Sequence, residues 1–179
     1  VPTKVALISR EDSAALTGYR MKNLWNGRQT ARPWLIESNL YVNSRMQSPE
    51  LILDDYEQFQ ELLAALRRFK PEFAIFDVFN VLHSGDENDN TEMRAVLRQL
   101  SKIQSEIGCG LAVIHHYNKT LGGRMTQRLR GSSAIAGWVE WLIGISMADE
   151  ASKTRKMEFE LKAAEAPEPI YYKIISTGD

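Results

Sequence analysis

The stretch Phe73–Phe79, FAIFDVF, decides the fold. Its residues are apolar except for Asp77. A short apolar run of this kind is typical of a strand buried on both faces in the middle of a parallel sheet. Burying a lone carboxylate is costly unless it is paired or bound to a metal ion. Asp77 is therefore either a cap for the following turn or a ligand for Mg²⁺ beside a bound nucleotide.

Two amphipathic segments flank this strand. Residues 54–69 carry apolar side chains at helical spacing, and Pro71 ends the segment. Residues 93–107 repeat the pattern and stop before Gly108. The next apolar run, LAVIHH at 111–116, predicts another strand that ends in two histidines.

Helix and strand also alternate before the central stretch. VALIS at 5–9 predicts a short buried strand, and Asp12 or Ser13 is a candidate cap for a helix that runs to about Trp25. PWLIE at 33–37 is a weaker strand candidate. This alternation predicts an α/β fold with a mostly parallel sheet and crossover helices.

The pattern changes after Trp138. Three strand-like runs at 139–147, 156–163 and 170–176 follow one another without helices between them, and EAPEP at 165–169 is typical of a turn. We expect antiparallel strands at the C-terminal edge of the sheet. No interdomain linker is visible, so residues 1–179 are expected to form a single domain.

Composition narrows the class of protein. The chain has 179 residues and a net charge of −1, so any basic binding site must be local. The single cysteine, Cys109, excludes a disulfide framework within the chain and is compatible with the cytoplasm. No apolar run approaches the roughly 20 residues of a membrane helix, so we expect no membrane partner.

Polar residues gather where the predicted strands end. Parallel sheets place their sites at the carboxyl ends of the strands. The first strand ends in Arg10, Glu11 and Asp12, and the later strand ends in His115 and His116. If these strands neighbour Asp77, carboxylates and an imidazole share one crevice. Glu11 is then either a first-turn residue favoured by the helix dipole or a base that orients an attacking water.

A metal-hydrolase site made of Asp77, His115 and His116 is a further alternative. Adjacent residues of a strand point to opposite faces, so two adjacent histidines rarely bind one ion together. The sequence therefore disfavours this alternative.

A basic stretch follows the histidines. Residues 107–139 contain no Asp or Glu but four basic side chains, which gives a local charge of +4: Lys119, Arg124, Arg128 and Arg130. Such a loop suits contact with phosphate, from a DNA backbone or a neighbouring subunit's nucleotide. A solvated loop with chance clustering of charge is the alternative.

Several fragments, in order, resemble one family. FAIFDVFNVLHSGDEN, GLAVIHHYNK, RLRGSSAIAGWVEWLIGI and FELKAAEAPEPIYYKI resemble the RecA-like ATPases of the plasmid RepA hexameric helicase group, which are akin to DnaB-type ring helicases. VALISREDSAALTGYRMKNL resembles the family's second core strand, which ends in a Glu–Asp pair. The resemblance implies a RecA-like core that uses ATP and Mg²⁺, binds single-stranded DNA and assembles into a homo-oligomer, as a ring in the family.

The resemblance also implies residue roles near the nucleotide. Glu11 resembles the catalytic glutamate that polarises the attacking water, and Asp77 resembles the Walker B ligand of Mg²⁺. The histidine pair occupies the family's sensor position. We expect one histidine to face the terminal phosphate, with His115 favoured for this catalytic role, and place His116 among the nucleotide-binding residues.

Other implied roles involve a neighbouring subunit and DNA. Arg130 resembles the arginine that reaches a neighbour's phosphates, and Lys162 resembles a nucleotide-binding lysine on a late strand. Relatives often have an arginine two residues after that lysine, where this chain has Ala164. Relatives usually have Asp where this chain has Glu140. DNA contact is expected from Lys119, Arg124 and Arg128, in the basic loop 119–130.

The family's glycine-rich GxxxxGK[ST] loop, whose backbone amides cradle phosphates, does not occur in the sequence. The chain starts with Val1 and reaches an apolar strand within a few residues. We therefore expect that residues preceding the second core strand are missing, and that this chain alone does not turn ATP over. The alternative is a non-catalytic RecA-fold partner or DNA-binding assembly module that never encoded the loop.

Overall fold

The computed structural model describes residues 3–27, 38–45, 50–117 and 124–175. The chain divides into two compact units, residues 1–116 and 117–179, and each is described by itself. The expectation of a single domain over 1–179 stays a prediction.

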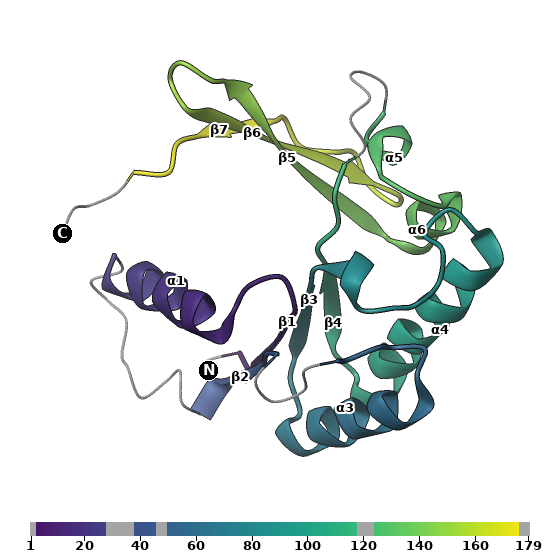
Figure 1. Ribbon diagram of the computed structural model, residues 1–179. Helices are drawn as coiled ribbons and strands as arrows, with labels where there is room; N and C mark the ends of the chain where they lie inside the picture. The colour runs from purple at the N-terminus through teal and green to yellow at the C-terminus, as the bar shows by residue number, and fades with distance from the viewer. Residues whose placement is uncertain (1–2, 28–37, 46–49, 118–123, 176–179) are drawn as a thin grey trace. The chain divides into compact units, whose positions relative to one another are not determined.

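The first unit is built on a four-stranded parallel sheet. Its strands are β1 (Val5–Ser9), β2 (Leu40–Asn43), β3 (Phe73–Asp77) and β4 (Gly110–Val113), in the order β2-β1-β3-β4 (Figure 1). The predicted α/β class with a mostly parallel sheet is confirmed. The weaker strand candidate at 33–37 lies outside the described residues.

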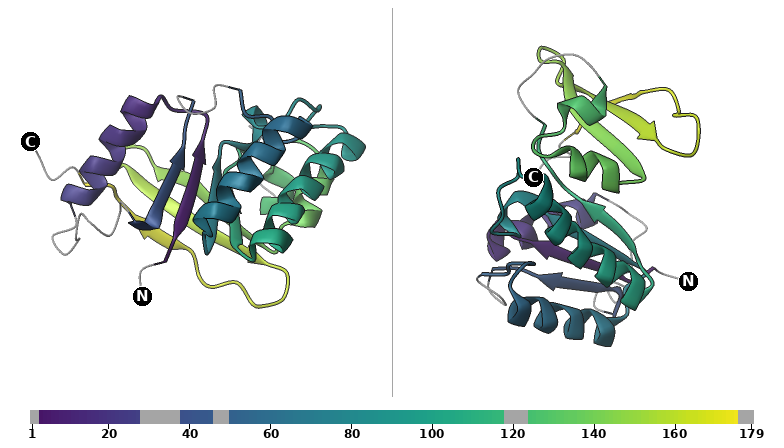
Figure 2. Two further views of the ribbon diagram at one scale, coloured as in Figure 1. Left: turned by 90° about the horizontal axis from the view of Figure 1, so that it is seen from below. Right: turned by 90° about the vertical axis from the view of Figure 1, so that its right-hand side faces the viewer.

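Helices connect these strands. They are α1 (Ala14–Asn26), α3 (Tyr56–Phe69) and α4 (Asn90–Ile107), with a short 3-10 turn at Phe79–Val81. Of the two candidate caps for α1, Ser13 is the one used, because its hydroxyl accepts a hydrogen bond from the Leu16 amide at 3.2 Å. Helices α3 and α4 lie side by side (Figure 2). Arg67 of α3 forms an ion pair with Glu106 of α4.

The two faces of the parallel sheet differ in burial. Ala6 and Ile8 of β1 are fully buried, and so are their register partners Ala74 and Phe76 of β3. Ile75, on the other face of β3, is only half-buried. The central strand was expected to be buried on both faces. The structure instead buries only one face completely. Side chains alternate along a strand, so Ala74 and Phe76 point to the buried face, whereas Ile75 points to the other face.

The second unit combines short helices with an antiparallel sheet. Its elements are α5 (Met125–Arg128), α6 (Ser133–Trp138), β5 (Trp141–Asp149), β6 (Thr154–Leu161) and β7 (Ile170–Tyr172). The strands pair antiparallel in the order β5-β6-β7, as the sequence predicted, but they form a sheet of their own rather than hydrogen-bonding to the parallel sheet. EAPEP falls between β6 and β7, as expected of a turn.

None of the helices formed by the described residues is both long enough and apolar enough to cross a membrane.

Candidate active site

The carboxyl ends of β1 and β3 lie next to each other. Ser9 is the register partner of Asp77, and the amide of Arg10 donates a hydrogen bond to the Asp77 carbonyl at 2.6 Å. Glu11 and Asp12 follow directly. The sheet register thus brings the carboxylates of two strands to one edge, where parallel α/β sheets place their sites.

This crowding of carboxylates shifts the pKa of Asp77. Burial raises the pKa of Asp77 above its ordinary value of 3.8, and the nearby charges of Glu11 and Asp12 raise it further. Arg20 and His116 act in the opposite direction, and Arg20 also forms an ion pair with Asp12. Asp77 is therefore a carboxylate held among like charges, an arrangement that a bound cation relieves.

The two adjacent histidines have different surroundings. β4 ends at Val113, but Ile114 still donates to the Phe76 carbonyl and accepts from the Phe79 amide, both at 2.9 Å. His115 is half-buried and meets the ring of Phe79 edge-on, with ring centroids 5.7 Å apart. His116 is exposed and is the histidine whose charge acts on Asp77. The surroundings favour His116, rather than His115, as the imidazole at the carboxylate edge.

The donor set at this edge fits Mg²⁺. Mg²⁺ prefers oxygen ligands and is usually bound through one or two carboxylates together with waters and substrate phosphates. Asp77 and Glu11 offer such oxygens. In the described ranges no group of three or more Asp, Glu, His or Cys residues forms a ready-made metal cage. The edge therefore suits an ion that arrives with a phosphate-bearing substrate.

The family of this chain follows from a comparison with known proteins. Residues 1–122, more than half of the chain, match the model of the AAA domain family. The chain belongs to the AAA domain family. No curated protein matches it. Membership supports a P-loop, RecA-like ATPase domain, and proteins with such a domain generally use ATP and Mg²⁺.

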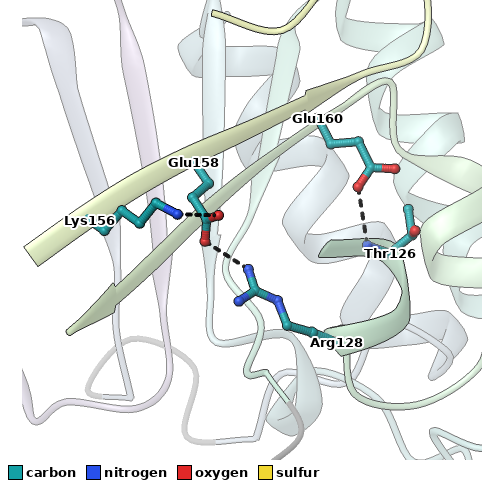
Figure 3. A network of polar contacts seen from close by, with 5 residues as sticks. All are labelled: Thr126, Arg128, Lys156, Glu158 and Glu160. Carbon is teal, nitrogen blue, oxygen red and sulfur yellow. Dashed lines mark hydrogen bonds and ion pairs between the residues drawn. The ribbon is translucent and has the colours of Figure 1, made fainter. Parts of the chain in front are cut away.

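Within this AAA-family chain, the second unit holds the remaining predicted residues. The side chain of Arg128 donates to Glu158 at 2.9 Å, and Lys156 donates to the same carboxylate at 2.8 Å (Figure 3). The Arg128 guanidinium also lies 4.7 Å from the ring centroid of Tyr117. Lys156 and Arg128 together hold the pKa of Glu158 below its ordinary value. Arg128 is thus already engaged by a carboxylate and an aromatic ring.

The other basic residues differ from Arg128 in their setting. Arg124 is exposed and precedes α5, and its backbone amide donates a hydrogen bond to the side-chain oxygen of Gln127 at 3.1 Å. Arg130 is also exposed. Lys162 directly follows β6, where its ammonium group donates to the Gly137 carbonyl at 2.5 Å. Lys119 lies outside the described residues.

Sequence reasoning missed two partners of the predicted residues. Arg20 lies eight residues after Asp12, on the helix that Ser13 caps, and no helical i,i+4 spacing points to that ion pair. Glu158 could have been found from the alternation Lys156, Glu158, Glu160, which places three charges on one face of β6.

Proposed function

We propose that this AAA-family chain is the core of a RecA-like ATPase of the RepA hexameric helicase type, which couples ATP hydrolysis to DNA binding or unwinding in the cytoplasm. The observation that carries the proposal is the meeting of Asp77, Glu11 and His116 at the carboxyl edge of the parallel sheet. Family membership supports the ATPase part of this proposal.

Asp77 and Glu11 have different proposed roles at this edge of the sheet. Asp77, at the end of β3, would hold Mg²⁺, which when bound neutralises developing charge on the phosphates. Glu11 is exposed and follows β1, in a position to accept a proton from a water molecule. Both groups act as carboxylates, and the mutual repulsion that raises the pKa of Asp77 is reduced when a cation is present.

We assign the sensing of the terminal phosphate to His116 instead of His115. His116 is exposed and acts electrostatically on Asp77, whereas His115 packs edge-on against Phe79. A group that reports on phosphate needs access to it, which the exposed imidazole has. His115 is then the packing partner of the pair.

Arg130 and Lys162 are proposed to contact nucleotide phosphates across a subunit interface of a homo-oligomeric ring. Arg130 is exposed, and a guanidinium suits a phosphate because it donates two parallel hydrogen bonds. The hydrogen bond from Lys162 to Gly137 would have to open before Lys162 reaches a phosphate.

DNA contact is proposed for the basic loop 119–130, and Arg124 is its best-placed described residue. Arg124 is exposed, whereas Arg128 would have to leave Glu158 and Tyr117 to reach a DNA phosphate. Phosphate contacts of this kind position a protein on single-stranded DNA without reading its sequence.

The absence of a GxxxxGK[ST] sequence in these 179 residues favours a second candidate function. Without amides that cradle phosphates, the chain alone would serve as a non-catalytic RecA-fold partner or DNA-binding assembly module. Both candidates predict the same fold, so they are separated by activity.

The test is ATP hydrolysis by the full natural protein that carries this sequence, measured with and without single-stranded DNA. The proposal predicts Mg²⁺-dependent hydrolysis that single-stranded DNA accelerates. A hydrolysis rate that single-stranded DNA does not change would contradict the proposed coupling to DNA. No hydrolysis under either condition would support the non-catalytic module instead.

A further inference from the structure

Arg10 is a charged side chain with almost no exposure. It is 2% exposed and lies just after β1. Its Nη1 donates to the carbonyls of Ser9 and Asn43, both at 2.8 Å, and its Nη2 donates to the Asn43 side-chain oxygen. Every one of these acceptors is neutral. Within the part of the chain that the structure describes, no carboxylate forms an ion pair with Arg10. A buried cation without a counter-charge is costly to fold around.

The Nε–H group of Arg10 is its remaining hydrogen-bond donor. Its Nε is buried and has no acceptor among the described residues. A buried N–H that lacks an acceptor carries the full cost of losing its water. Such an atom in a folded protein calls for an explanation, and a bound anion or water is among the usual ones.

Arg10 borders a cavity of about 250 Å³. The cavity is lined by Arg10, Arg45, Glu50, Leu51, Ile52 and Val81. Arg45 brings a second guanidinium to the same space, and its charge adds to the burial that lowers the pKa of Arg10 to about 10. Glu50 contributes one opposing carboxylate, and no ion pair joins it to either arginine in the described ranges. The lining therefore carries a net positive charge.

We propose that this cavity binds a phosphate-type oxyanion between Arg10 and Arg45. Guanidinium groups match the geometry of phosphate oxygens and bind them through paired hydrogen bonds. The anion would bring negative charge beside both arginines, neither of which forms an ion pair with a carboxylate of the described residues. The inference does not depend on ATP hydrolysis by the chain.

This anion site is separate from the Asp77 edge, although it begins one residue away. Arg10 reaches toward Asn43 at the end of β2, whereas Glu11 acts on Asp77 at the end of β3. The two sites thus share the end of β1 and use different neighbouring strands. An anion at Arg10 would sit next to the backbone that carries the proposed catalytic glutamate.

The test uses the 179-residue chain and the Nε–H signal of Arg10 in ¹⁵N NMR spectra. Buried Nε–H groups exchange slowly enough to be observed, and Arg10→Lys assigns the signal. Inorganic phosphate is titrated at constant ionic strength against chloride, and the proposal predicts a saturable shift of this signal. Arg45→Glu should weaken phosphate binding by about tenfold or more, because it removes a charge-assisted partner. Arg45 is exposed, so this variant does not depend on a change in the core.

Arg98→Glu is the matched control, since Arg98 is exposed on α4 and the substitution changes the net charge equally. It should leave phosphate binding unchanged. A second titration with a short single-stranded oligonucleotide identifies which phosphate the site binds. Displacement of inorganic phosphate by the oligonucleotide supports a site for nucleic-acid phosphates. Phosphate binding without such displacement supports a site for a free or nucleotide phosphate. The proposal is overturned if neither ligand shifts the Arg10 signal, or if Arg45→Glu and Arg98→Glu weaken binding alike.

Discussion

At the scale of single residues, Asp77 links stability to function. Its pKa is raised by burial and by Glu11 and Asp12, so the folded protein holds this proton more tightly than the unfolded chain does. Stability from this group is therefore lost as the pH rises from the ordinary carboxyl range through the raised pKa. At neutral pH the charged side chain destabilises the fold, as is common where a site is kept for binding.

Asp77→Asn should therefore raise the melting temperature at pH 7 by a few degrees, because it removes a charge that repels its neighbours. The gain should shrink as the pH is lowered toward the ordinary carboxyl range. Thermal unfolding followed by circular dichroism across this pH range is the measurement. Glu61→Gln, at an exposed position on α3, is the charge-matched control and should change the free energy of unfolding by less than about 0.5 kcal/mol. A variant less stable than the wild type at pH 7 would contradict the account.

The arginines of the basic loop also differ residue by residue. Arg124→Glu should weaken binding to single-stranded DNA and flatten its salt dependence without loss of stability, since Arg124 is exposed. Arg128→Glu should in addition lower stability by about 1–3 kcal/mol, because it removes one of the two cationic partners of Glu158 and places a second carboxylate beside it. Fluorescence anisotropy and denaturant unfolding measure the two effects. Equal stability of the two variants would show that the pair with Glu158 is not formed.

At the scale of elements, the strand–helix alternation and the helix ends followed from the sequence. FAIFDVF, the amphipathic segment before Pro71 and the glycine at 108 predicted β3, α3 and the end of α4. Local patterns of this kind depend on spacing and on capping residues, which a single sequence displays. The succession of β5, β6 and β7 predicted their antiparallel pairing, but no local pattern showed that they form a sheet of their own.

The candidate site was predictable only in part from the sequence. The sequence predicted that Glu11 and Asp77 share one crevice if their strands are neighbours, and the register of β1 and β3 makes the ends of these strands neighbours. It did not separate His115 from His116, since β4 ends at Val113 and alternation no longer fixes which ring points where. Nor did it reveal the ion pair of Arg128 with Glu158, which joins residues thirty positions apart.

Gly144 on β5 tests the packing of the second unit. A Cβ at this position would lie 1.7 Å from the Tyr117 hydroxyl and 2.7 Å from the Met125 sulfur. Gly144→Ala should therefore lower the free energy of unfolding by about 1–3 kcal/mol. Gly137→Ala is the control, since nothing lies within 4 Å of its added Cβ and alanine favours the α6 helix. Chemical denaturation of both variants is the measurement, and unchanged stability of Gly144→Ala would contradict the packing of Tyr117 on β5.

At the scale of the whole molecule, the family match stands beside a sequence that contains no phosphate-loop motif. The AAA domain match covers residues 1–122, yet the 179-residue sequence contains no GxxxxGK[ST]. Carboxylates and an imidazole alone do not replace backbone amides that surround phosphates. The chain is thus expected to carry the catalytic edge of an ATPase without its phosphate cradle.

The 179-residue chain by itself should bind Mg-ATP only weakly and should not turn it over. Isothermal titration with Mg-ATP is the measurement, and Mg²⁺ alone is the control for ion binding at the Asp77 edge. Micromolar affinity for Mg-ATP would show that this chain holds phosphates by groups other than a GxxxxGK[ST] loop.

The central claim is that the edge of Glu11, Asp77 and His116 hydrolyses ATP. The most direct measurement is the steady-state ATPase rate of the full natural protein carrying this sequence, compared between wild type and Glu11→Gln. Loss of a general base lowers a rate by about a hundredfold or more. We expect a loss of this size with ATP binding retained. Hydrolysis by Glu11→Gln at the wild-type rate would contradict a catalytic role for Glu11.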